Sequence, residues 1–344
     1  MAQKMRWAAI AIIAALAMSA GAQAADEKPL VPVHVGVIGI LAEAGLYTAA
    51  EHGFFKDEGL DVSFQRGIFG PDAMPALATG RLDAMGGAFG PELINASQRG
   101  IGVRLVASMN NYIAGWDAGY LTVRKELIDS GRVKDWKDLK GLKIALVAPA
   151  PNMTDYFAFH YLALGGLTLN DVTTVNVPFD QMITALKTGG VDVAHISEPQ
   201  TTIIADQGLA VKWRPVSDYA PPGLSVALLQ YGPSLIEKSP DTGVRLLMGY
   251  IRGARYYDNA LKTPEGRSEV ARILMKYTPV KDRSLYDRLT FAYAPPDAAI
   301  TMAGLQDMAN YYASHGGPNA GDVHSLVDDH FREAALAKLG AEKP

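Results

Sequence analysis

The strongest constraint on the fold is a short pattern that occurs twice in the chain. Residues 76–83 read A-L-A-T-G-R-L-D, and residues 185–192 read A-L-K-T-G-G-V-D. Each copy predicts a helix that ends at the threonine, a glycine that closes it in the left-handed conformation, and a short strand that begins at the aspartate. A Gly-Leu pair and an apolar strand stand upstream of each copy, at 59–64 and 166–177. The repeat therefore predicts two lobes of related β-α-β construction.

The remaining hydrophobic pattern alternates strands with helices, which is typical of parallel sheets. The expected strands are 33–38, 61–65, 83–88, 103–108, 142–148, 172–177, 191–196 and 225–230. The expected helices are 46–55, 72–79, 92–98, 154–164, 181–188, 241–262, 268–276, 283–291, 297–314 and 323–339. Because parallel α/β sheets bind ligands beyond the carboxyl ends of their strands, the loops after the strands are the expected site.

The first residues predict export. A positively charged start is followed by the apolar stretch 7–20 and then by the small residues around Ala24. This order is typical of a signal peptide, and the apolar run is too short to span a bilayer comfortably. We expect residues 1–24 to be removed near Ala24, with an uncleaved anchor as the alternative. The mature chain should then be a soluble periplasmic protein of two domains.

The composition argues against several functions. The 344 residues carry a net charge of −4, which disfavours nucleic acid as a partner. There is no cysteine, so disulfides, thiol catalysis and lipid attachment at a cysteine are excluded. The chain has no P-loop, serine-hydrolase elbow or zinc-protease motif. We therefore expect no catalysis, no cofactor, no metal and a monomer.

Further segments resemble one known family. Residues 50–62, A-E-H-G-F-F-K-D-E-G-L-D-V, look like the "GFFxxEGLdV" element of nitrate/sulfonate/taurine-type substrate-binding proteins of ABC importers. The repeated pattern, residues 136–145 and Glu198-Pro199 resemble that family's motifs in the same order. The resemblance runs from about residue 33 to 208, and more weakly to the end of the chain, and it does not specify a ligand.

The resemblance implies a type II periplasmic binding protein, a Venus flytrap whose two α/β lobes close around a ligand. Each lobe would be a mainly parallel sheet flanked by helices. Residues 120–123 and 224–228 suit the two chain crossings, so that lobe 1 holds 25–120 plus 226–344 and lobe 2 holds 121–225. The implied function is to capture a small molecule between the lobes and deliver it to the permease of an ABC importer. A module that presents its ligand to a sensor is the alternative, and an enzyme on the same fold is less favoured.

The candidate ligand-binding residues lie in loops that follow strands. In the first lobe they are Gly39, Gly45, Tyr47, Phe69, Phe89, Gly90 and Glu92. Near the crossing, Asn111 and Trp116 supply an amide and an aromatic ring that can stack on a flat ligand. In the second lobe they are Asn152, Met153, Thr154 and Glu198. Each has a structural alternative: Asn152 or Thr154 can simply cap a helix, and Glu198 can hold its loop.

The charges in these loops bear on the ligand. Acidic residues predominate at Glu43, Glu92, Asp117, Asp155, Asp180 and Glu198, and Arg66 is the only obvious cation. A sulfonate or carboxylate normally needs arginine or several helix-end amides. A neutral or nitrogen-bearing heterocycle or amide therefore fits better, with a small organic anion as the other possibility. In the first loop, Glu43 has a solvated side chain as its structural alternative to a ligand contact.

Overall fold

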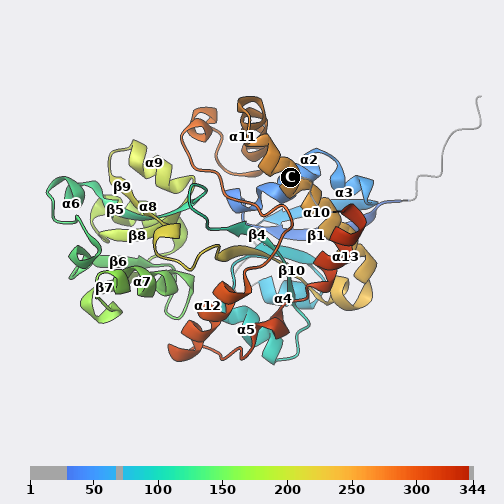
Figure 1. The fold of residues 1–344 in the computed structure, drawn as a ribbon, viewed down its shortest axis with the longest axis horizontal. Coiled ribbons are helices and arrows are strands. Elements are labelled where there is room, and N and C mark those ends of the chain that lie inside the picture. The colour runs from blue at the N-terminus through green and yellow to red at the C-terminus, as the bar shows by residue number, and fades with distance from the viewer. Residues whose placement is uncertain (1–28, 67–72, 341–344) are drawn as a thin grey trace, which may run out of the picture.

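The computed structural model describes residues 29–66 and 73–340 (Figure 1). The expected signal peptide, residues 1–24, and the candidate Phe69 lie outside the described residues. Within the described ranges, no helix combines the length and the apolar character needed to cross a membrane.

Two five-stranded sheets form the framework, one in each lobe. The first has the order β2-β1-β3-β10-β4, with bounds β1 (Val31–Val37), β2 (Leu60–Arg66), β3 (Ala84–Gly87), β4 (Arg104–Asn111) and β10 (Ser225–Tyr231). The second has the order β7-β6-β8-β5-β9, with bounds β5 (Gly119–Arg124), β6 (Lys143–Leu146), β7 (Thr173–Asn176), β8 (Val193–Ser197) and β9 (Ala210–Pro215). In each sheet four strands run in the same direction. The remaining strand, β10 in the first sheet and β5 in the second, is antiparallel to both of its neighbours. The predicted two-lobed α/β fold is confirmed.

Helices flank both sheets. The first lobe carries α2 (Ala44–Glu51), α3 (Phe54–Asp57), α4 (Ala73–Ala78), α5 (Pro91–Gln98), α10 (Pro240–Ala260), α11 (Pro264–Tyr277), α12 (Met302–Ser314) and α13 (His330–Leu339). The second carries α6 (Lys125–Asp129), α7 (Met153–Leu164), α8 (Met182–Thr188) and α9 (Gln200–Asp206). Short 3-10 turns are η1 (Leu41–Glu43), η3 (Trp136–Leu139), η4 (Leu169–Asp171), η5 (Phe179–Gln181), η6 (Val216–Asp218), η8 (Arg283–Asp287) and η9 (Val323–Leu326), and η7 (Ser234–Lys238) is a π-helical turn.

Both copies of the repeated pattern fold as predicted. They end α4 and α8, and the glycines that follow, Gly80 and Gly189, have φ angles of 75° and 73°. The two copies also share the hydrogen bond that their aspartates accept. The backbone N–H of His34 in β1 donates to Asp83 at 2.8 Å, and that of Lys143 in β6 donates to Asp192 at 2.9 Å. Each aspartate thus fastens its own strand to the parallel strand beside it, so β1 and β6 are equivalent strands of the two lobes.

The chain crosses between the sheets at positions slightly different from those expected. Residues 120–123 lie inside β5, which pairs with β8 on one side and β9 on the other. Residues 225–228 lie inside β10 of the first sheet. The connections between the sheets are therefore residues 112–118 and 216–224.

The helical end of the chain is more interrupted than predicted. The expected helix 283–291 is only the 3-10 turn η8, and the expected helix 297–314 begins at Met302. The expected helix 323–339 is split between η9 and α13 by a bridge from Val327 to Leu105 of β4. At this point the N–H of Asp328 donates to the Leu105 carbonyl at 2.9 Å. Backbone groups that bond to another part of the fold cannot continue a helix, which explains the break.

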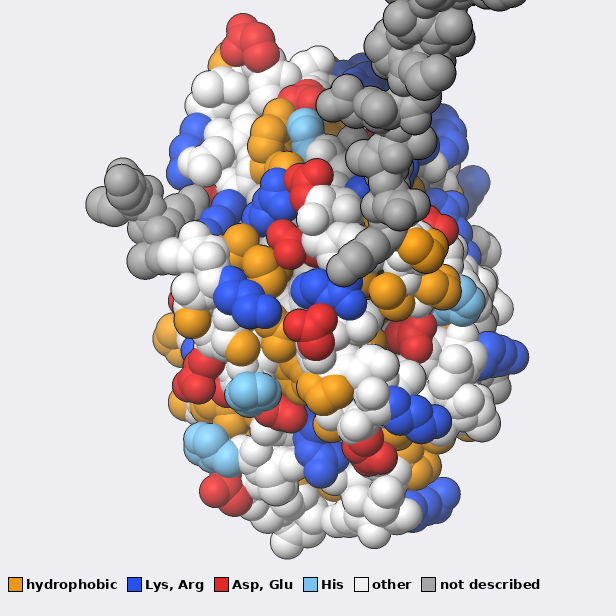
Figure 2. Space-filling view, turned by 90° about the vertical axis from the view of Figure 1, so that its right-hand side faces the viewer, with side chains coloured by type: hydrophobic (Ala, Val, Ile, Leu, Met, Phe, Trp, Pro, Cys, Tyr) orange, Lys and Arg blue, Asp and Glu red, His pale blue; other side chains and the backbone are white. Residues whose placement is uncertain are grey.

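Basic and acidic side chains are interspersed over the end of the first lobe shown in Figure 2. Ion pairs of this lobe include Arg252 with Asp57 at 2.7 Å and Arg332 with Asp329 at 2.7 Å. The described residues on this face therefore form no continuous basic patch.

Close packing of α2 against α10 supports the first strand-end loop. A Cβ atom added at Gly253 would lie 2.3 Å from the carbonyl oxygen of Gly45, and one added at Gly45 would lie 2.9 Å from the Tyr250 ring. Glycine at both positions lets the two helices touch through their backbones.

We expect Gly253→Ala to force α2 away from α10 and to lower the free energy of unfolding by about 1–3 kcal/mol, the usual cost of overpacking. Denaturant-induced unfolding would measure the loss. Ser268→Ala, at an exposed position of α11, is the control and should stay within about 0.5 kcal/mol of the parent. Equal stability of both variants would contradict the packing argument.

Candidate functional site

The lobes meet first between α7 of the second lobe and α12 of the first. Figure 1 shows α12 lying between the second lobe and α5. The Tyr311 hydroxyl of α12 donates to Asp155 of α7 at 2.8 Å. In the opposite direction, the Tyr156 hydroxyl of α7 donates to Asp307 of α12 at 2.7 Å. The His160 ring lies 3.2 Å from the same Asp307 carboxylate. Two reciprocal tyrosine–aspartate bonds therefore join the lobes on this side.

The lobes meet a second time at Glu198, which follows β8. Its carboxylate accepts from the Thr202 hydroxyl at 2.7 Å and from the N–H of Thr290 in the first lobe at 3.3 Å, and it pairs with Lys212. The Tyr120 hydroxyl lies 2.9 Å from that of Thr290. Glu198 is only 1% exposed. Its carboxylate therefore binds other groups of the protein in this structure, which agrees with the alternative that Glu198 holds its loop.

A pocket of about 370 Å³ lies beside this second contact. It is lined by Gly115, Trp116, Arg267, Leu289, Thr290 and Phe291. The Arg267 guanidinium lies 5.5 Å from the centre of the Phe291 ring, and the Trp116 ring packs edge-on against Tyr293 at 6.1 Å. The pocket thus combines aromatic surface with one cation. Trp116 was a sequence candidate, whereas Arg267 was missed because nothing near it in the sequence marks a site.

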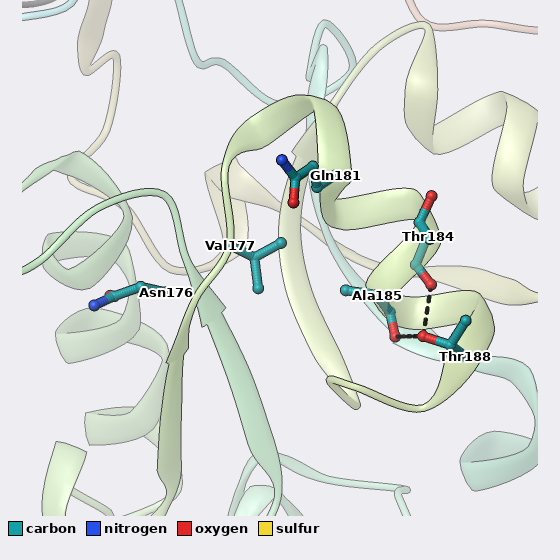
Figure 3. Close-up of a pocket in the computed structure, with 6 residues that line it drawn as sticks. All are labelled: Asn176, Val177, Gln181, Thr184, Ala185 and Thr188. Atoms are coloured by element: carbon teal, nitrogen blue, oxygen red, sulfur yellow. Dashed lines mark hydrogen bonds between the residues drawn. The ribbon is translucent and has the colours of Figure 1, made fainter.

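A second pocket, of about 450 Å³, lies on the second lobe between the end of β7 and α8 (Figure 3). Its lining is Asn176, Val177, Gln181, Thr184, Ala185 and Thr188. The Thr188 hydroxyl already donates to the carbonyls of Thr184 and Ala185, at 2.9 and 3.4 Å. None of the candidate residues from the sequence lines this pocket.

The expected first loop, residues 39–47, is shorter than predicted, and this corrects two candidates. Gly45 and Tyr47 belong to α2, where Gly45 packs on Tyr250. Tyr47 is fully buried and stacks on Tyr277 with ring centres 4.7 Å apart. The apolar face of α2 is covered by α10 and α11, so neither residue is open to a ligand in this structure. Gly39, with a φ of 91°, does lie in the loop.

Glu43 is buried, which rules out the solvated alternative. Its carboxylate accepts from the consecutive N–H groups of Ile38, Gly39 and Ile40 at 2.8, 2.8 and 3.0 Å, and from the Tyr47 hydroxyl at 2.7 Å. Burial raises the pKa of Glu43 above its ordinary value, and the four donors oppose that rise. The sequence held no capping-box signature here, because Ile40, three residues before Glu43, has no side-chain acceptor.

The candidates after β3 adjoin α12. The Phe89 side chain is buried, and its carbonyl accepts from the Tyr312 hydroxyl at 3.1 Å. Gly90 is the N-cap of α5, and a Cβ there would lie 2.4 Å from the Glu92 carboxylate, so the Glu92 side chain rests directly over this glycine. Burial raises the pKa of Glu92. No side chain among the described residues donates a hydrogen bond to the Glu92 carboxylate.

The remaining candidates stabilise the fold around the junction. Asn111 accepts from the Ser225 hydroxyl at 3.0 Å and so ties β4 to the start of β10. Asn152 caps α7 by accepting from the N–H of Thr154 at 2.8 Å. The Thr154 hydroxyl in turn accepts from Val147 at 2.9 Å. Met153 is half-buried against the core. Among residues 29–66 and 73–340, no three His, Asp or Glu side chains are grouped so that they could hold a metal ion.

Comparison with solved structures identifies the class of fold. The periplasmic nitrate-binding protein NrtA from Synechocystis PCC 6803 aligns with a TM-score of 0.73 at 16% identity, covering 90% of this chain and 89% of that one. The alkanesulfonate-binding protein SsuA from Xanthomonas axonopodis pv. citri, bound to MOPS, aligns at 0.65 and 17%, covering 87% and 98%. The desulfurization enzyme DSZB aligns at 0.61 and 13%, covering 90% and 100%. The fold is that of the periplasmic binding proteins, which also occurs in an enzyme.

The family follows from the sequence comparison. The model of the NMT1/THI5-like family matches residues 42–266, and the chain therefore belongs to that family. Together with the nitrate- and sulfonate-binding neighbours, this confirms the resemblance found in the sequence. No curated protein matches the chain.

We expect Tyr311→Phe to lower the free energy of unfolding by about 1–3 kcal/mol, because the buried Asp155 carboxylate loses a donor. Thermal and denaturant unfolding would measure this. The control is Tyr256→Phe, since the Tyr256 hydroxyl donates to Glu269 at 2.7 Å near the surface. That change should cost less than about 1 kcal/mol, and a larger loss in the control than at Tyr311 would refute the prediction.

Glu92 should make stability depend on pH. Because burial raises its pKa, the folded chain holds the proton more tightly than the unfolded chain. The contribution of Glu92 to the free energy of unfolding should therefore fall as the pH rises from about 4 through the folded-state pKa. Glu92→Gln has no titrating carboxyl group at this position, so it does not lose stability in this way as the pH rises. The melting temperature of Glu92→Gln minus that of the parent should therefore increase with pH. Glu265→Gln, at an exposed position, should show no comparable trend.

Proposed function

We propose that this protein is an exported solute-binding protein that captures a small organic molecule between its lobes and delivers it to an ABC importer. Membership of the NMT1/THI5-like family and the fold it shares with nitrate- and sulfonate-binding proteins support the proposal. The single-chain connections at 112–118 and 216–224 give the lobes the hinge that such a function needs.

One observation carries the proposal: helix α12 contacts the strand-end loops of both lobes at adjacent residues. Tyr312 donates to the carbonyl of Phe89, after β3 of the first sheet. Its neighbour Tyr311 donates to Asp155, after β6 of the second. The carboxyl ends of strands from both sheets therefore converge on one place, which is where α/β proteins bind their ligands.

The finer parts of the proposal follow from this role. The protein would act in the periplasm as a monomer, with an inner-membrane permease as its partner and no catalytic activity. The absence of cysteine from the sequence removes thiol mechanisms on this fold. The only histidine of β8, His195, is buried, and burial lowers its pKa to about 4, so that it stays neutral. The ligand would be a small organic anion or a neutral or nitrogen-bearing heterocycle or amide.

The mature chain, unfolded and refolded to remove bound molecules, should be stabilised by one class of compound in a panel of sulfonates, nitrate, carboxylates, pyrimidines, amides and amines. A ligand at about 100 times its Kd adds about 2.7 kcal/mol to the free energy of unfolding, which a thermal melt detects. Turnover of the stabilising compound would contradict the binding role, and uptake that depends on a permease would support the importer over a sensor.

Trp116→Ala should weaken binding of that compound about tenfold, the equivalent of about 1.4 kcal/mol, because the ring lines the pocket beside the junction. Calorimetric titration would measure the change. Leu164→Ala is the matched control, because Leu164 is 53% exposed at the far end of α7. Unchanged affinity in both variants would remove Trp116 from the site.

A further inference from the structure

The loop after β1 is an oxyanion site whose anion belongs to the chain itself. Three consecutive N–H groups, from Ile38 to Ile40, point at one carboxylate, that of Glu43. The positive φ of Gly39, 91°, turns the backbone so that they converge. Successive amides arranged in this way bind phosphate, sulfate and carboxylate groups in proteins. Glu43 is 0% exposed. Its carboxylate therefore occupies the position beside these amides that an external anion would take.

The equivalent loop of the second lobe has a related but smaller arrangement, with a single amide donor. After β6, the N–H of Asn152 donates to Asp155, which is also 0% exposed. Each buried carboxylate further accepts from a tyrosine hydroxyl, Tyr47 for Glu43 at 2.7 Å and Tyr311 for Asp155 at 2.8 Å. Two independent parts of the chain thus place a buried acid on backbone amides at corresponding strand ends, three amides in the first lobe and one in the second.

At one further strand end among the described residues, an acid again accepts from backbone amides. The carboxylate of Glu198, after β8, accepts from the N–H groups of Thr202 and Thr290 at 3.2 and 3.3 Å. The cations are also engaged: Lys212 pairs with Glu198, and Arg66 donates to the Tyr277 carbonyl. Arg267 lies apart from these loops, in the pocket beside Trp116.

We propose that Glu43 and Asp155 determine specificity as built-in anions: they occupy the amide donors that an oxyanion would need, so the cargo is a neutral or positively charged molecule that donates hydrogen bonds. This inference rests on the proposed binding function and narrows its ligand class. A nitrate, sulfonate or carboxylate entering between these loops would find these amides already bonded to the two buried carboxyl groups. A protonated amine or an amide N–H would instead find carboxylate and carbonyl acceptors, of which Glu92 is the least occupied.

The first test removes the internal anion. Glu43→Ala should melt at a lower temperature than the parent in sodium chloride and should recover by several degrees in sodium formate or nitrate of the same ionic strength. Glu43→Gln keeps the side-chain volume in place, so neither it nor the parent should respond to these anions. If Glu43→Ala does not fold in chloride, its refolding yield in formate provides the same comparison. If formate and nitrate raise neither the melting temperature nor the refolding yield of Glu43→Ala, the loop after β1 is not an oxyanion site.

The second test uses the unaltered chain. Titrations with nitrate, methanesulfonate, acetamide and methylammonium compounds should show that the anions bind at least a hundredfold more weakly than the preferred donor-bearing class. A sulfonate or nitrate that binds below millimolar concentration overturns the inference and leaves the binding-protein function intact. If Glu43→Ala responds to formate but no compound of any class binds the parent, the proposed function fails, and the ligand class inferred from it fails as well.

Discussion

The carboxylate of Asp155 is the point on which the relation between the lobes depends. It is buried, and an ionised group without water is stable only where donors surround it. Its donors come from both lobes, the Asn152 amide at the start of α7 and the Tyr311 hydroxyl of α12. By holding Tyr311, Asp155 also sets the position of Tyr312, which reaches the loop after β3. The spacing of the two strand-end loops therefore follows from the needs of one buried charge.

In both lobes a buried carboxylate accepts from backbone amide and tyrosine donors, but the partners differ. Glu43 takes its tyrosine from its own helix, Tyr47 of α2, whereas Asp155 takes Tyr311 from the opposite lobe. The first strand-end loop is thus fixed by its own lobe, with α2 held against α10 through Gly45 and Gly253. The corresponding loop of the second lobe keeps its full set of donors only while α12 stays in place. A separation of the lobes would leave the first loop unchanged and the second one short of a donor, an asymmetry that suits an opening and closing protein.

The parts of the fold that could be predicted depend on local signals. The threonine–glycine–aspartate repeat contains its own helix end, turn and strand start, and Gly80 and Gly189 adopt the expected conformation. The misplaced elements depend on distant residues: the break between η9 and α13 arises from the bridge of Val327 to Leu105, far away in the sequence. The candidate site shows the same division. Asn152 was recognisable from the sequence as a helix cap. The burial of Tyr47 in the core and the position of Arg267 beside Trp116 were not recognisable, because both depend on how α10 and α11 pack.

The position of β10 has a consequence for the order in which the chain can fold. The second sheet is built from one continuous stretch, β5 to β9, whereas the first sheet has β10 inserted between β3 and β4. The N-terminal lobe therefore lacks an interior strand until residue 231 has been synthesised, although most of its strands are made first. Until then β3 and β4 have exposed edges, and the lobe cannot form its complete hydrogen-bonded sheet. The lobe that begins the chain is thus the last to be completed, which leaves its strands extended and unpaired for longest during synthesis.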